Sequence, residues 1–171
     1  MAEAYKALPM VMEHEGGFVD DPVDRGGVTN FGISLRFLRS VGVDIDGDGD
    51  IDAEDIRKIT REQAKTLFVA HFWRFDALVS QELANKLFDV ACNMGLASAV
   101  KLAQRALNGM GWNLAVDGQW GTKTATAANS VPAEAILREI RALQATRYAE
   151  IAVADPTQKR FLLGWMRRTM A

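Results

Sequence analysis

Residues 15–33, EGGFVDDPVDRGGVTNFGI, separate a short helix-like segment from a long helix-like remainder. The pair Gly16-Gly17 predicts the end of the helix expected over residues 2–14, because glycine terminates helices. Glycine and aspartate are frequent in the rest of the stretch, and the β-forming run Val28–Phe31 predicts a short strand. The sequence therefore predicts a mainly α fold with a small β excursion near residues 18–33.

Apolar side chains on both sides of this stretch recur with the 3.6-residue period of an α-helix. Helix starts are indicated by Ser34, by Ser80, by the capping-box spacing of Thr60–Gln63 and by Pro132. The long helix that begins at Pro132 should bury one stripe, formed by Ile136, Ile140, Leu143 and Ile151. The helices that we expect cover residues 2–14, 34–40, 60–72, 80–95 and 98–107, a short segment from Thr122, residues 132–155, and a last segment around 161–166.

The composition is that of one ordinary globular domain. The chain has 171 residues, of which 49% are hydrophobic, and 20 Lys and Arg against 22 Asp and Glu, which excludes a mainly disordered protein. The single cysteine, Cys92, excludes an intrachain disulfide, and two histidines are too few for a convincing zinc site. No apolar run approaches the roughly 20 residues that cross a membrane, so we expect no membrane insertion.

The N-terminal residues MAEAYKALPM lack the basic region and the apolar run of a signal peptide. We therefore expect synthesis in the cytoplasm without a signal peptide, and release by another route if the protein acts outside.

Seven acids and no base lie between Asp44 and Asp55, which leaves a basic excess elsewhere. This excess of basic residues would favour binding to a polyanionic surface. An ordinary solvent-exposed charged face explains the excess equally well. Because the basic residues are spread out, we expect no nucleic-acid partner.

The acidic segment Asp44–Asp55, DIDGDGDIDAED, closely fits the pattern of a twelve-residue calcium-binding loop. Gly49 falls at position 6, where the sharp turn needs glycine, but position 12 carries aspartate in place of the usual glutamate. An exposed acidic turn is the alternative interpretation. The residues predicted to hold a structural calcium ion are Asp44, Asp46, Asp48, Asp50 and Asp55.

Glu15 follows the first predicted helix, at the end where the helix dipole is negative. Such a position disfavours ionisation and raises a carboxyl pKa, as general-acid catalysis at a glycosidic oxygen requires. Eight residues separate Glu15 from Asp24, and four separate Asp24 from Thr29. Inverting glycosidases use two carboxyl groups about 6.5–9.5 Å apart with a water between them. The spacing alone fits a surface glutamate and a turn aspartate at least as well.

A family resemblance favours the catalytic interpretation. Glu15–Phe18, then Asp21-Pro22 and Gly26–Ile33, resemble the signature of glycoside hydrolase family 108, the phage and prophage N-acetylmuramidases called endolysins. The likeness continues through His71–Trp73, Phe88-Asp89 with Asn93, and the tail Phe161–Arg167, so it covers nearly the whole chain. It implies a single lysozyme-like domain over residues 1–171, and a catalytic part over residues 1–85 that includes the loop 44–55.

The resemblance also implies roles for individual residues. The family's proposed acid maps onto Glu15, and Asp24 would orient or activate water with help from Thr29. Phage-type lysozymes have eight and then five residues between these three positions, whereas this chain has eight and four, which puts Thr29 in doubt. The chemistry needs no cofactor, so any calcium would be structural.

Residues 86–171 form a helical part that resembles a predicted peptidoglycan-binding region. Within it, Asp117–Thr124, DGQWGTKT, resembles the Asp-Gly-x-x-Gly-x-x-Thr turn of peptidoglycan-binding modules, with two glycines for tight turns before a helix start. Trp112 and Trp120 would either stack on sugars or join the core, whereas we expect Trp73 and Trp165 in the core. The predicted substrate-binding residues are Asn30, Asn93 and Trp120, and Gln104 is a further hydrogen-bonding candidate.

The resemblance thus predicts a monomeric hydrolase of bacterial peptidoglycan that cleaves the β-1,4 bond between N-acetylmuramic acid and N-acetylglucosamine and reaches the wall after release. Two alternatives stay open. A lytic transglycosylase would use Glu15 alone, because the substrate's own hydroxyl attacks. A non-catalytic, calcium-dependent wall-binding module would bind cell walls without cleaving them.

Overall fold

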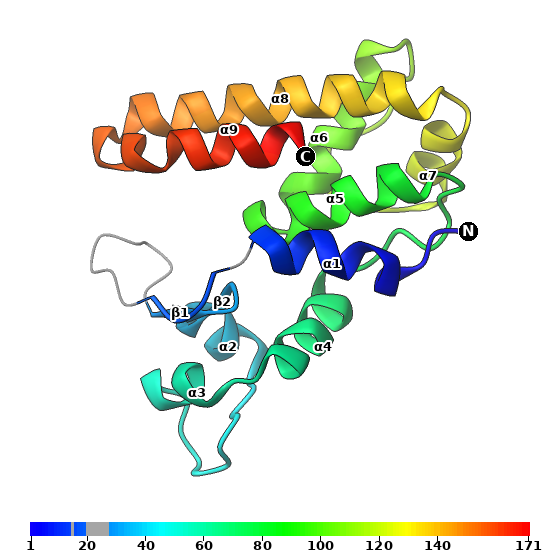
Figure 1. Ribbon diagram of the computed structural model, residues 1–171. Coiled ribbons are helices and arrows are strands. Elements are labelled where there is room, and N and C mark those ends of the chain that lie inside the picture. The colour runs from blue at the N-terminus through cyan, green and yellow to red at the C-terminus, as the bar shows by residue number, and fades with distance from the viewer. Residues whose placement is uncertain (15, 20–27) are drawn as a thin grey trace. The chain divides into compact units, whose positions relative to one another are not determined.

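The computed structural model describes residues 1–14, 16–19 and 28–171 (Figure 1). The predicted fold class is confirmed, because the described chain is mainly helical and carries one small antiparallel sheet. Two compact units make up the chain: residues 9–71 form one, and residues 1–8 with residues 72–171 form the other. Helix α1, Ala4–His14, begins in the second of these units and ends in the first.

The unit of residues 9–71 holds the sheet and three short helices. Strands β1, Thr29–Asn30, and β2, Ile33–Ser34, pair around a two-residue turn in which Phe31 and Gly32 have φ values of 47° and 77°. Positive φ at both residues is typical of a tight hairpin turn. The helices are α2, Leu35–Val41, α3, Ala53–Lys58, and α4, Arg61–Phe72.

Helix α3 is absent from the sequence prediction, which placed only an acidic loop there. Asp52 caps its first turn by accepting from the backbone N–H of Glu54, and Asp55 accepts from the backbone N–H of Asp52. The last acids of the loop therefore also serve as the N-terminal cap of a helix.

The larger unit contains the remaining helices: α5, Gln81–Met94, α6, Leu96–Gly109, α7, Thr122–Asn129, α8, Ala133–Ala154, and α9, Leu162–Met170. A 3₁₀ helix, Pro156–Phe161, joins α8 to α9, and these two helices lie side by side and antiparallel (Figure 1). Leu87, Val100, Leu107 and Ile140 are among the fully buried core residues of this unit. None of the helices in the described residues is long and apolar enough to cross a membrane.

The buried stripe of α8 differs from the prediction. Ile136 and Ile140 are buried as expected, but the stripe continues through Gln144 and Tyr148, whereas Leu143 and Ile151 are only half-buried. Gln144 Nε2 donates to Tyr148 Oη at 3.0 Å, whereas Gln144 Oε1 is buried with no hydrogen-bond partner among the described residues. A hydrophobicity pattern cannot identify polar residues that become core by pairing.

Candidate functional site

Two of the three predicted catalytic residues, Glu15 and Asp24, lie outside the described residues. The third, Thr29, is half-buried in β1, and its backbone N–H and C=O both pair with Val19, at 2.9 and 2.8 Å. Helix α1 ends at His14, so Val19 lies only a few residues beyond that helix end. The described backbone therefore brings Val19 alongside Thr29.

The predicted substrate-binding asparagines both make hydrogen bonds within the protein. Asn30 is buried, and its Nδ2 donates to the carbonyl of Ile56 at 3.0 Å, which fastens β1 to α3. Asn93 is exposed at the end of α5, and its Oδ1 accepts from the hydroxyl of Tyr148 at 2.7 Å.

The four tryptophans have different surroundings. Trp73 is buried and packs edge-to-face on Phe88, with ring centroids 5.3 Å apart. Trp165 is half-buried and stacks on Tyr148 at 5.0 Å. Trp120 is half-buried, whereas Trp112 is 38% exposed. The two tryptophans that the sequence left undecided thus differ in how much surface they offer.

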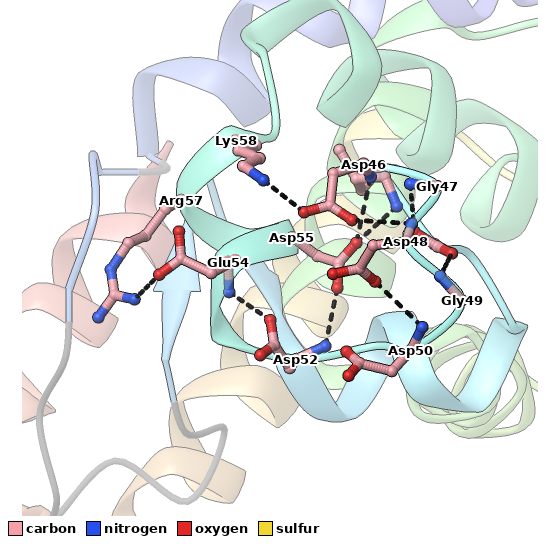
Figure 2. Close-up of polar contacts among 12 residues, drawn as sticks. Asp46, Gly47, Asp48, Gly49, Asp50, Asp52, Glu54, Asp55, Arg57 and Lys58 are labelled. Carbon is pink, nitrogen blue, oxygen red and sulfur yellow. Dashed lines mark hydrogen bonds and ion pairs between the residues drawn. The ribbon is translucent and has the colours of Figure 1, made fainter.

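The acidic loop presents an all-oxygen donor set (Figure 2). Carboxylate oxygens of Asp44, Asp46 and Asp48 lie within 4.8 Å of one another, and those of Asp50, Asp52 and Asp55 form a second such group. Both groups could hold a metal ion, and oxygen ligands are those that calcium prefers. The second group includes Asp52, which the sequence prediction left out.

Hydrogen bonds and charges set the protonation of this loop. Lys58 Nζ lies 2.6 Å from Asp46 Oδ2 and lowers the pKa of that carboxyl (Figure 2). The charges of Asp48 and Asp52 raise the pKa of Asp50. Repulsion within the loop is therefore only partly relieved by the lysine, and a bound cation would relieve it further.

Asp55, at position 12 of the loop, is buried and fastened to the backbone. Burial alone would raise the pKa of its carboxyl, but hydrogen bonds from the backbone N–H groups of Asp52 and Ile45 lower it. These bonds are 2.7 and 2.6 Å long. Asp55 thus closes the loop by itself, with both oxygens already accepting backbone hydrogen bonds.

A buried charged cluster at the end of α9 is absent from the sequence prediction. Arg168 Nη2 pairs with Asp89 Oδ1 at 2.9 Å, and both side chains are buried. Lys86 is buried beside them, and its Nζ donates to the carbonyls of Arg168 and Thr169 at 2.8 and 2.9 Å. In the sequence, Lys86 and Asp89 lie three residues apart within one predicted helix, and nothing in that local pattern indicates that they are buried.

Gln104 of α6 organises the turn that precedes α7. Its Nε2 donates to Asp117 Oδ1 at 2.8 Å and to the carbonyl of Gln119 at 3.2 Å, while its Oε1 accepts from the N–H of Gly118 at 3.0 Å. The hydrogen bonds from the N–H of Gln119 and from the Gln104 side chain lower the pKa of Asp117. The Gln104 side chain is buried, and its three hydrogen bonds hold the turn in place.

The two glycines of this turn differ in conformation. Gly118 has a φ of +80°, as a tight turn requires, whereas Gly121 has a φ of −118° that any residue adopts. The expectation that both glycines serve tight turns is therefore wrong for Gly121. Gly121 is instead the N-cap of α7, where no side chain caps the first turn.

Comparison with known proteins identifies the class. Residues 8–95 match the family model described as Glycosyl hydrolase 108, and residues 98–170 match the one described as Predicted Peptidoglycan domain. The protein is therefore a glycoside hydrolase joined to a predicted peptidoglycan-binding region. It belongs to the glycosyl hydrolase 108 family, whose model covers more than half of the chain.

A solved structure has a similar fold. The structure of Brucella abortus SagA superposes with a TM-score of 0.79 at 28% sequence identity, over 98% of this chain and 89% of that one. The comparison with curated protein sequences gives no match.

Proposed function

We propose that this protein is an N-acetylmuramidase that hydrolyses the β-1,4 bond between N-acetylmuramic acid and N-acetylglucosamine in bacterial peptidoglycan. The observation that carries the proposal is the pairing of a glycosyl hydrolase 108 match with a predicted peptidoglycan domain on one chain. A glycosidase joined to such a region has the glycan strand of the wall as its natural substrate.

In this mechanism Glu15 protonates the leaving oxygen, and Asp24 with Thr29 orients or activates the attacking water. Two described features support the proposal. Helix α1 ends at His14, the residue before Glu15 in the sequence, and the C-terminal end of a helix carries the negative end of its dipole. The backbone of Val19 pairs with that of Thr29, the proposed water-binding residue.

We further propose that the loop 44–55 holds one structural calcium ion that takes no part in the chemistry. Two groups of three aspartates and the raised pKa of Asp50 support this role, because a divalent cation would offset the repulsion. Its ligands would come from Asp44, Asp46, Asp48, Asp50 and Asp55.

Mass spectrometry of the fragments released from purified sacculi tests the reaction. Reducing-end muramic acid is expected from a muramidase. Anhydro-muramic ends would instead indicate a lytic transglycosylase and leave Asp24 without a catalytic role. Binding to sacculi without any released fragment would indicate a wall-binding module.

Glu15→Gln tests the proposed acid, because an amide keeps the shape of the carboxyl but cannot donate the proton. We expect loss of wall lysis by about a hundredfold or more, with an unchanged melting temperature. Glu13→Gln is the matched control: Glu13 is an exposed acid of α1 with no role in the proposed reaction. Equal activities of the two variants would remove Glu15 from the mechanism.

A further inference from the structure

Two pockets lie on either side of the N-terminal end of α7, within the unit of residues 1–8 and 72–171. One has a volume of about 480 Å³, and Arg74, Asp76, Trp120, Thr126 and Asn129 are among its lining residues. The other has a volume of about 390 Å³ and is lined in part by Gln104, Asp117 and Lys123. Both pockets include Gly121 and Thr122, so they adjoin at the first turn of α7.

The first pocket, which we call the Trp120 pocket, has an aromatic ring and several polar side chains among its lining residues. Trp120 packs edge-to-face on Phe75, with centroids 5.0 Å apart at 79°, and this contact fixes the ring at the pocket wall. A sugar ring carries C–H groups on its face and hydroxyl groups around its edge, so an indole beside polar side chains complements it.

Other contacts hold the polar groups of this pocket in place. Asp76 Oδ1 accepts from Trp73 Nε1 at 2.7 Å, which orients the carboxylate. Asn129 donates to the carbonyl of Ala77 at 2.8 Å and accepts from the N–H of Val79 at 2.9 Å. Side chains that are already fixed lose little conformational entropy when a ligand binds.

The adjoining pocket offers backbone donors and a cation. No side chain caps the first turn of α7, and Lys123 lies in that turn. Free N–H groups at a helix start attract acyl carbonyl and carboxylate oxygens. Such oxygens occur in the N-acetyl and lactyl groups that substitute the sugars of peptidoglycan, so one glycan segment could occupy both pockets.

We propose that the Trp120 pocket is a glycan-binding subsite that holds an N-acetylated sugar ring of the peptidoglycan strand, with the first turn of α7 facing the acyl substituents. The subsite rests on the proposed function only in taking peptidoglycan as the ligand. It recognises the glycan and not the peptide stem, because an aromatic ring beside hydrogen-bonding side chains complements a sugar ring.

Nuclear magnetic resonance of the four tryptophan indole N–H groups can locate the binding. The protein is the full chain carrying Glu15→Gln, so that it does not digest the probe, a tetramer of N-acetylglucosamine. The Trp120 signal, assigned from its loss in a Trp120→Phe variant, should shift on titration, while that of Trp165 stays fixed. The Trp120 indole N–H makes no hydrogen bond within the described residues, so Trp120→Phe should still fold.

Thr126→Met tests the pocket by partly filling it. Thr126 is exposed on α7 and lines the Trp120 pocket, so the longer side chain should weaken tetramer binding at this site at least fivefold. Thr146→Met, at an exposed threonine of α8 outside both pockets, should bind as before.

The possible outcomes separate this subsite from the reaction. A fixed Trp120 signal, equal binding by both methionine variants, or a Trp120 shift caused by free stem peptide alone would overturn the glycan subsite. Each of these results could occur while muropeptides are still released from sacculi. Conversely, a Trp120 shift without released fragments would support the subsite and contradict the muramidase.

Discussion

At the scale of single residues, Lys86 is the least expected feature of the molecule. Burial, together with the charges of Arg141 and Arg168, lowers the pKa of its amine to about 8, while Asp89 opposes the shift. The amine nevertheless keeps a fixed place, because it donates to two carbonyls at the end of α9. The folded protein therefore holds this proton less tightly than the unfolded chain does.

The stability of the protein should depend on pH through this lysine. Between about pH 8 and about pH 10.5 the unfolded chain binds more protons at Lys86, so its contribution to the unfolding free energy rises with pH. The Lys86→Met variant carries no charge at this position at any pH, so its unfolding free energy should lack this increase with pH. Urea unfolding at about pH 7 and about pH 9.5 measures the unfolding free energy of both proteins. The stability of the wild type relative to the variant should be greater at the higher pH. A difference independent of pH would contradict the lowered pKa.

At the scale of elements, local sequence signals predicted the helix starts well. Ser34 accepts from the N–H of Phe37, Ser80 accepts from that of Leu83, and Thr60 and Gln63 form the expected reciprocal cap. Each of these bonds spans three residues, so the sequence contains all of the information. The burial of Lys86 depends instead on carbonyls more than 80 residues away. No local pattern encodes such a contact.

The turn before α7 gives a prediction at this scale. A Cβ on Gly118 would lie 3.0 Å from the carbonyl oxygen of Ala97 and 3.1 Å from Cε of Lys101, at a φ of +80°. Gly111 also has a positive φ, +97°, but nothing lies near its Cβ position. Gly111→Ala should therefore cost only the backbone strain, about 1–2 kcal/mol. Gly118→Ala should cost at least about 1 kcal/mol more, because α6 must give way.

Urea unfolding of the two alanine variants measures this difference. Equal losses of stability would mean that Gly118 is required only for its backbone angle. A larger loss for Gly118 would show that the close approach of the turn to α6 selects glycine at the second position of the Asp-Gly-x-x-Gly-x-x-Thr pattern.

At the scale of the whole molecule, the N-terminal residues are hydrogen-bonded to residues far along the chain. The N–H of Ala2 donates to the carbonyl of Leu78 at 2.8 Å, and the N–H of Glu3 donates to Gln81 Oε1 at 2.8 Å. Sequence periodicity predicted the helix but could not predict this partner, because the contact joins segments almost 80 residues apart. The sequence also predicts a boundary between a catalytic part, residues 1–85, and a helical part, residues 86–171. That boundary stays a prediction.

Calcium should act on only one of the two units. The described hydrogen bonds of the acidic loop, including those of Asp55 to Ile45 and of Arg39 to Ile51, stay within residues 9–71. An ion at a hundred times its Kd stabilises what it binds by about 2.7 kcal/mol. Hydrogen exchange should therefore slow in residues 43–58 when calcium is added to chelator-treated protein, with no change over residues 98–170.

Asp48→Asn should weaken this protection, because it removes one charge at position 5 and keeps an oxygen that can accept the hydrogen bond from Asp50. Glu62→Gln removes one exposed acid of the same unit outside the loop and should leave the protection unchanged. Slower exchange spread over both units would show that the ion stabilises the molecule as one body. An unchanged exchange pattern in the wild type would show that the aspartates form an exposed acidic turn, in which Lys58 and the backbone N–H groups are the partners of the carboxylates.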